Sequence, residues 1–149
     1  MGLKRNLLLR QLLWQLSVVV VFAAPALGDW PQFRGPNSSG IAPGVSPPVE
    51  FGPGRNELWK VPMVAGHSSP IVVGDVIFLT TWDKEDRKLA VVCIARSNGK
   101  IRWQADVPVE RFEKGHASFN PASSTPATDG ERVVAYFGSF GLVCFDMEG

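Results

Sequence analysis

Residues 70–105 read PIVVGDVIFLTTWDKEDRKLAVVCIARSNGKIRWQA, and this stretch decides the fold. Runs of apolar, β-branched and aromatic residues alternate with turn signals, which predicts short strands. The expected strands are 70–73, 76–82, 89–94 and 101–105. The run 89–94 is apolar throughout, which is typical of a strand buried on both faces. Asn98-Gly99 favours a tight hairpin because both residues tolerate positive φ. The stretch therefore predicts four antiparallel strands joined by short turns.

The same pattern recurs further along the chain. Ser124-Thr125-Pro126 repeats Ser68-Ser69-Pro70 at an offset of 56 residues, and the runs 132–137 and 142–145 repeat the second and third strands. The sequence ends at 149, where a fourth strand would follow. Upstream, Leu58-Trp59-Lys60 matches Arg102-Trp103-Gln104, so 58–61 is expected to be a fourth strand without its first three.

A four-stranded unit that recurs at this spacing is typical of a propeller blade. A lone N-terminal strand suits a ring, because pairing it with the last blade removes exposed sheet edges. We therefore expect an all-β chain, an incomplete β-propeller with four-stranded antiparallel blades. Its parts are an irregular Pro/Gly-rich leader (29–57), a closing strand (58–61), a blade (66–106) and an incomplete blade (117–149). In an incomplete propeller, the outward surfaces of the first and last sheets lack a neighbouring blade. We expect one side of strand 91–94 to lack cover, and Trp59 to pair only with strands outside this sequence.

The N-terminus has the layout of a secretory signal. Lys4 and Arg5 precede an apolar run over 12–24, and Ala26-Leu27-Gly28 offers small residues for cleavage. We expect residues 1–28 to be a signal peptide and the product to be periplasmic or secreted. A membrane anchor is the alternative, but the run is short beside the roughly 20 residues that a span needs, so no stable span is expected after cleavage.

Net charge and cysteine positions limit the expected partners and the expected state of the thiols. Removing 1–28 takes away three basic and no acidic residues, so the net charge changes from +1 to −2. A near-neutral chain does not favour nucleic acid as a partner. Cys93 and Cys144 occupy equivalent repeat positions, which favours buried, unpaired thiols, although an exported protein can also form a disulfide.

Residues 93–103, CIARSNGKIRW, resemble the tryptophan-docking motif of pyrroloquinoline-quinone (PQQ)-type propellers, Ala-x-Asp-x-x-Thr-Gly-Lys-x-x-Trp. Gly99, Lys100 and Trp103 match the motif. Cys93, Ala95 and Asn98 depart from it. The stretches 29–36 and 122–139 are similar to exported members of this family, including outer-membrane-assembly-factor-like propellers, so the resemblance covers nearly all of 29–149. It implies that Trp103 docks between blades.

The resemblance leaves the function open, because one fold can host unrelated activities. The leading hypothesis is a non-catalytic exported module that binds a protein or polymer in the cell envelope, with no cofactor evident. The alternative is the N-terminal part of a quinoprotein dehydrogenase that uses pyrroloquinoline quinone and calcium, although no calcium ligands or catalytic Asp match here. A truncated reading frame without activity is a third possibility.

His67 and His116 are the candidate channel-mouth residues, since each precedes an inner strand in a connection between blades. Such residues can transfer protons or bind a metal. The simpler interpretation is a loop histidine that hydrogen-bonds to backbone, because neither accompanies a cluster with ligand spacing. The charged run 83–88 is expected to be a solvated turn rather than a calcium loop, which would place oxygen ligands around a glycine.

Overall fold

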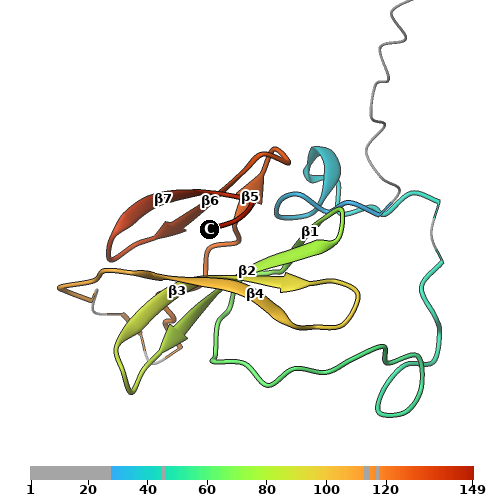
Figure 1. Ribbon diagram of the computed structural model, residues 1–149, viewed down its shortest axis with the longest axis horizontal. Helices are drawn as coiled ribbons and strands as arrows, with labels where there is room; N and C mark the ends of the chain where they lie inside the picture. Colours follow the sequence, from blue (N-terminus) through green and yellow to red (C-terminus); the bar gives the residue numbers. More distant parts are fainter. Residues whose placement is uncertain (1–27, 45, 113–114, 117) are drawn as a thin grey trace, which may run out of the picture.

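The computed structural model describes residues 28–44, 46–112, 115–116 and 118–149, and the protein is all-β over these residues (Figure 1). The first sheet has the order β1-β2-β3-β4, and its strands are β1 (Ile71–Val73), β2 (Val76–Asp83), β3 (Lys88–Ala95) and β4 (Ile101–Val107). The second sheet has the order β5-β6-β7, with β5 (Ala127–Thr128), β6 (Arg132–Phe137) and β7 (Gly141–Asp146). All pairs are antiparallel. The strands expected from the two repeats are confirmed. The expected signal peptide lies outside the described residues, apart from Gly28.

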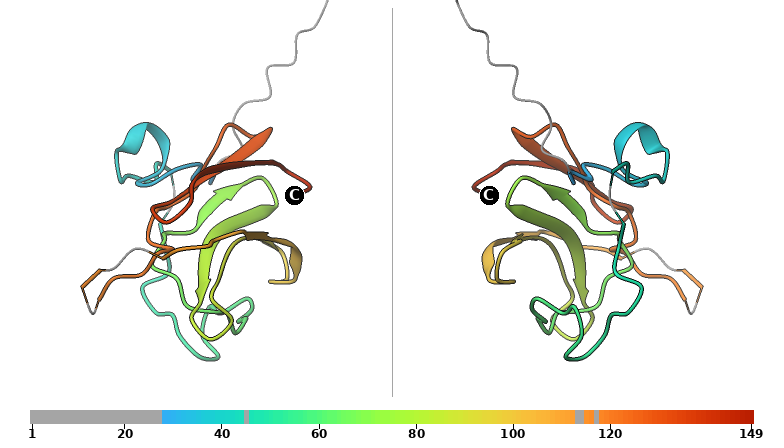
Figure 2. Two further views of the ribbon diagram at one scale, coloured as in Figure 1. Left: turned by 90° about the vertical axis from the view of Figure 1, so that its left-hand side faces the viewer. Right: turned by 90° about the vertical axis from the view of Figure 1, so that its right-hand side faces the viewer.

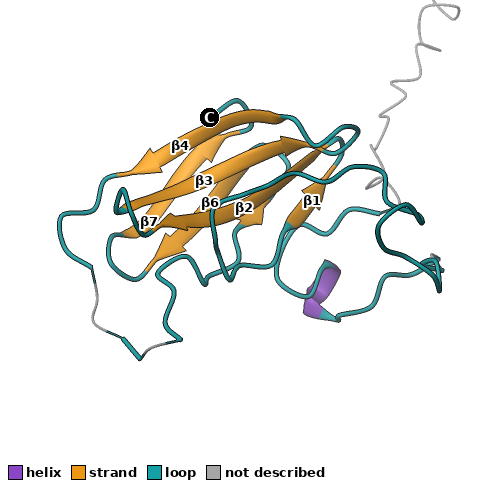
Figure 3. Ribbon diagram, turned by 90° about the horizontal axis from the view of Figure 1, so that it is seen from below, coloured by secondary structure: helices purple, strands orange, loops and turns teal. Residues whose placement is uncertain are grey.

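A short 3₁₀ turn, η2 (Pro36–Ser38), lies in the leader (Figure 3). Within the described ranges, no helix has the length and apolar character needed to cross a membrane.

The hairpin between β3 and β4 turns at Gly99 as expected, but Asn98 does not adopt the positive φ that its pairing with Gly99 predicted. Five residues, 96–100, connect the two strands, and the turn is closed by Ala95 N donating to Lys100 O at 2.8 Å and Gly99 N donating to Ala95 O at 2.8 Å. Gly99 has a φ of 73°. The Asn98 side chain accepts a hydrogen bond from Lys100 N at 2.9 Å, which stabilises this turn.

The two sheets pack face to face, and the core lies between them (Figures 1 and 2). The first sheet contributes one side of its strands, including Phe78, Leu89, Val91 and Cys93, all 0% exposed. The second sheet contributes the alternate residues of β6, which are Val133, Ala135 and Phe137. Successive side chains of a strand point to opposite faces, so every second residue enters this core.

The opposite side of β3 is also covered, which corrects the expectation of a bare flank. Ala90, Val92 and Ile94 are at most 2% exposed, and Trp59 packs against them. Trp59 belongs to the segment 58–65, which runs below the first sheet in Figure 1, on the side away from the second sheet. The strand expected at 58–61 is not formed among the described residues, because this segment is extended but has no ladder partner. The Trp59 side chain and a backbone hydrogen bond, from Trp82 N to Ala65 O at 2.8 Å, hold it to the sheet instead of a strand ladder.

Two short contacts fix the connections that join the sheets. Ser69 N donates to Thr125 Oγ1 at 3.1 Å, and these two residues hold the same position in the two repeats. Thr80 is fully buried in β2, and its hydroxyl lies 3.3 Å from Ala122 O. The repeated Ser/Thr-Pro segments therefore meet across the interface and help to set how one sheet lies on the other.

Candidate docking site

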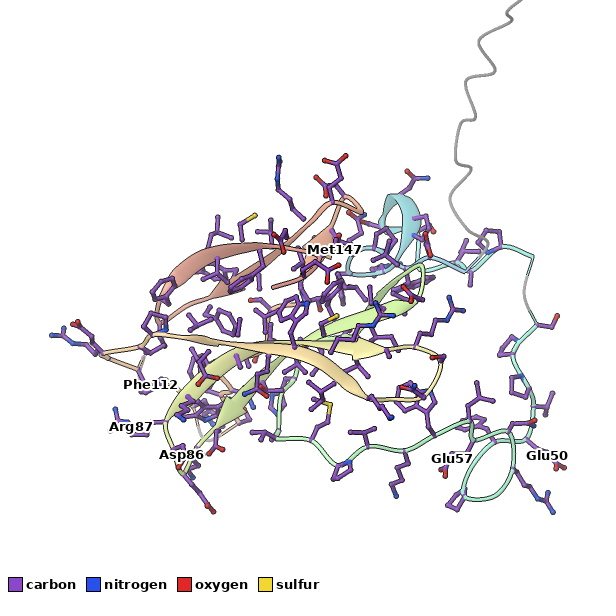
Figure 4. The ribbon with its side chains drawn as sticks, viewed as in Figure 1. Glu50, Glu57, Asp86, Arg87, Phe112 and Met147 are labelled. Atoms are coloured by element: carbon purple, nitrogen blue, oxygen red, sulfur yellow. The ribbon has the colours of Figure 1, made fainter. Side chains whose placement is uncertain are left out.

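Trp103 lies between the two sheets, at the position that the sequence motif singles out. Its ring centroid is 5.7 Å from that of Phe78 in the first sheet and 5.8 Å from that of Phe145 in the second. Its indole Nε1 donates to Met147 O at 2.9 Å. Met147 is the first residue after β7, and Figure 4 labels it beside the first sheet. Trp103 therefore joins an aromatic cluster on both sheets to one backbone carbonyl of the second.

Trp59 makes the equivalent contact with the first sheet. Its Nε1 donates to Arg96 O at 2.7 Å, and Arg96 is the first residue after β3, as Met147 is after β7. Gly99 also contacts this ring, since a Cβ at Gly99 would lie 2.6 Å from Trp59 Cε3. A Cβ at Gly149 would lie 3.0 Å from the Trp103 ring. Each tryptophan thus sits against the glycine turn that follows a third strand.

The expectation that Trp59 contacts only strands outside this sequence is wrong. The match between 58–60 and 102–104 predicts equivalent positions for the two tryptophans, but it does not show that the equivalence lies in their indole contacts. In the structure, the Trp59 indole donates a hydrogen bond to the turn after β3 and packs on that strand, although the segment around Trp59 pairs with no strand.

Lys100 and Gly99 have different roles in the motif. Gly99 is buried with positive φ, so close approach and backbone conformation both require glycine there. Lys100 is exposed, and its backbone closes the hairpin.

His67 and His116 are both exposed and lie in the connections, not in a buried site. His67 N donates to Ala122 O at 3.0 Å, and the His116 ring Nδ1 lies 3.1 Å from Ser118 Oγ. Over the described part of the chain, no three His, Cys, Asp or Glu residues gather closely enough to hold a metal ion. These contacts are those of loop histidines.

The two cysteines are unpaired, but their environments differ. Cys93 is buried between the sheets, and burial raises the pKa of its thiol to about 11. Cys144 is exposed. The expectation of two buried thiols is therefore correct for Cys93 and wrong for Cys144, because nothing among the described residues covers the side of β7 to which Cys144 belongs.

That uncovered side of the second sheet is largely apolar, and we call it the outer face. Its apolar members are Val134 (37% exposed), Tyr136 (49%), Leu142 (70%) and Cys144, and the charged pair Arg132 and Asp146 lies on the same side at one end. The register pairs Val134 with Cys144 and Tyr136 with Leu142, so the four side chains form two adjacent cross-strand pairs. These side chains therefore form a solvent-exposed apolar patch on the second sheet.

The charged turn 83–88 is solvated, as expected. Asp83 Oδ1 accepts hydrogen bonds from Glu85 N at 2.9 Å and Asp86 N at 3.0 Å, which uses the carboxylate within the turn. The Arg87 guanidinium lies 5.0 Å from the centre of the Phe112 ring, at the end of the molecule labelled in Figure 4.

Comparison of the chain with protein-family models, with curated proteins and with solved structures finds no match.

Proposed function

We propose that the two sheets are consecutive blades of an exported propeller of the PQQ-repeat type, acting as a non-catalytic module that binds a protein or polymer in the cell envelope. The observation that carries the proposal is the repeated tryptophan contact. Trp59 and Trp103 each donate from Nε1 to the first carbonyl after a third strand. A contact that recurs from one repeat to the next is what stacked repeats require.

The outer face supports the same proposal. Leu142 and Cys144 hold the repeat positions of Val91 and Cys93, which are buried under the second sheet. By this equivalence the outer face is built to accept a further sheet of the same kind. Such a sheet would bury the apolar pairs that are exposed here.

We favour the binding role over quinone-dependent catalysis because the glycine and the tryptophan of the docking motif pack against neighbouring segments of the chain. Gly99 and Trp103 form contacts between elements, and His67 and His116 are exposed loop residues. The part of the chain that the structure describes has no group of carboxylates that fits calcium, so we assign no quinone-dependent step to these residues. Export is inferred from the N-terminal sequence, and sequencing of the secreted product should begin at Asp29.

Thiol accessibility tests the stacking. The chain of 149 residues and the protein purified from its native source are treated with iodoacetamide without denaturant, and peptide mapping reports the modification of each cysteine. We expect Cys144 to react quickly in the 149-residue chain and slowly in the native-source protein, where a further sheet covers it. Cys93 is the internal control and should react slowly in both. Equal, fast modification of Cys144 in both samples would show a self-contained pair of sheets and overturn the proposal.

A further inference from the structure

The first strands of the two sheets share an unusual neighbour, a short stretch of the leader. β1 and β5 are edge strands, because each pairs with only one strand of its own sheet. Trp30 forms an antiparallel bridge with Val72 in β1, in which Trp30 N donates at 2.7 Å and Val72 N donates back at 2.9 Å. The next residue reaches the other sheet, since Thr128 N of β5 donates to Pro31 O at 2.9 Å. Residues 29–31 therefore lie across both edges (Figure 1).

A side chain adds to this backbone pairing. Asp29 Oδ1 accepts a hydrogen bond from Gly74 N at 2.9 Å, in the turn that follows β1. Every hydrogen bond that the sheets give to this stretch comes from a backbone amide, those of Val72, Gly74 and Thr128. Recognition by backbone amides at a sheet edge is how an extended peptide adds to a sheet.

The residues after this stretch fold mainly on themselves. Gly35 N donates to Gln32 O at 2.9 Å, and Gly40 N donates to Arg34 O at 2.7 Å. Gly35 is buried against Trp30, where a Cβ would lie 2.4 Å from the ring, and its φ is 67°. The segment 29–40 is thus a small unit that holds its own tryptophan in place and touches the sheets chiefly through 29–31.

We propose that the adjacent edges of β1 and β5 form a binding site for an extended polypeptide, filled in this structure by the chain's own residues 29–31 acting as a displaceable strap. The peptide class is an acidic residue followed by an aromatic residue and proline, because Asp29 binds an amide and Pro31 needs no donor partner. Asp29, Trp30 and Pro31 are only half-buried, so few contacts oppose their release. This inference gives a location to the binding role proposed above, but it requires neither a ring nor export.

The strap is released in the full chain by Gly35→Ala, which directs a methyl group into the Trp30 ring. Gly54→Ala is the matched control, since Gly54 has a φ of 76° and open space around its Cβ position. Amide hydrogen exchange is followed by NMR. In Gly35→Ala the Val72 and Thr128 amides should exchange at least about tenfold faster, while β3 amides stay protected. In Gly54→Ala all of them should keep the wild-type rates. Unchanged exchange at Val72 and Thr128 in Gly35→Ala would overturn the proposal.

The second step tests binding in trans. A synthetic peptide of residues 29–40, DWPQFRGPNSSG, is added to the Gly35→Ala protein, and the same peptide with an N-methyl group on the Trp30 nitrogen is the control. The unmodified peptide should bind saturably and restore protection at the Val72 and Thr128 amides. The methylated peptide, which lacks the donor to Val72 O, should bind at least about tenfold more weakly. The wild-type chain should bind less, because its own strap competes at an effective concentration on the order of millimolar.

No binding of the unmodified peptide, or equal binding of both peptides, would overturn the site. Should Gly35→Ala fail to fold, as loss of β3 protection would show, Asp29→Ala takes its place. It removes the bond to Gly74 N and leaves the backbone bonds of 29–31, so the Gly74 amide should exchange faster, and unchanged exchange there would count against the site. A negative result in these experiments would not affect the stacking proposal. That proposal is decided separately by the accessibility of Cys144, which lies in β7 and not at the β5 edge.

Discussion

Gly99→Ala is the change that most directly tests the tryptophan contact. The added Cβ would lie 2.6 Å from Trp59 Cε3 and 2.7 Å from Val61 Cγ2, so the segment 58–65 must move. Its φ of 73° also places alanine in the left-handed region. Gly74→Ala is the control, because Gly74 has a φ of 54° and no heavy atom within 4 Å of its Cβ position.

The expected cost has two parts. Left-handed backbone costs about 1–2 kcal/mol for a residue with a Cβ, and this part applies to both variants. Moving Trp59 breaks its 2.7 Å bond to Arg96 O, worth about 1 kcal/mol, and loses packing on β3 worth about 1 kcal/mol more. We therefore expect the free energy of unfolding to fall by about 3–4 kcal/mol in Gly99→Ala and about 1–2 kcal/mol in Gly74→Ala.

Urea unfolding followed by far-ultraviolet circular dichroism measures both variants without relying on tryptophan emission. A double-mutant cycle then isolates the contact. In a Trp59→Ala background, Gly99→Ala should cost about 2 kcal/mol or less, because the ring has gone and only backbone strain and Val61 remain. Equal losses in Gly99→Ala and Gly74→Ala, or an unchanged cost of Gly99→Ala in the Trp59→Ala background, would refute the reasoning.

Three further outcomes are expected. Trp103→Phe should lower the free energy of unfolding by about 1 kcal/mol, because Met147 O loses its donor while an aromatic ring stays between the sheets; urea unfolding measures this, and no loss would mean that the bond contributes nothing. The pKa of Asp129 should lie below its ordinary value in an NMR titration, because two backbone amides donate to its carboxylate. Its contribution to stability should therefore be present above the unfolded-state pKa and disappear as the pH falls through the folded-state pKa, a dependence that Asp129→Ala should remove. Titration of the 149-residue chain with pyrroloquinoline quinone and calcium should show no saturable change in quinone absorbance, and saturable binding would favour the dehydrogenase alternative.

Most of the strand architecture could be predicted from the sequence because the repeats carry strong local signals. The β-branched run of β2 and the apolar run of β3 define strands with little help from tertiary contacts. The turn at Gly99 was also predictable as a turn, although its conformation depends on the hydrogen bond that Asn98 Oδ1 accepts from Lys100 N.

The covering contacts could not be predicted in the same way. The sequence predicted bare flanks on both sides of the pair. Among the described residues, the outer face is uncovered, whereas the segment with Trp59 covers the other flank. Nor did the breakers in 29–57 reveal that Trp30 pairs with β1. Both contacts are long-range in sequence, and neither is marked by strand periodicity. They are formed by single aromatic residues in otherwise irregular segments.

The cover over β3 has a consequence for self-association. The two broad surfaces of the first sheet are different, so contacts between successive sheets are heterologous and can continue head to tail. A molecule whose 58–65 segment peeled away would present both complementary surfaces at once, Val92 and Ile94 at one end and Leu142 at the other. Copies would then add to one another without limit unless the rotation closed them into a ring. In this structure the segment around Trp59 covers the surface through which such growth would proceed.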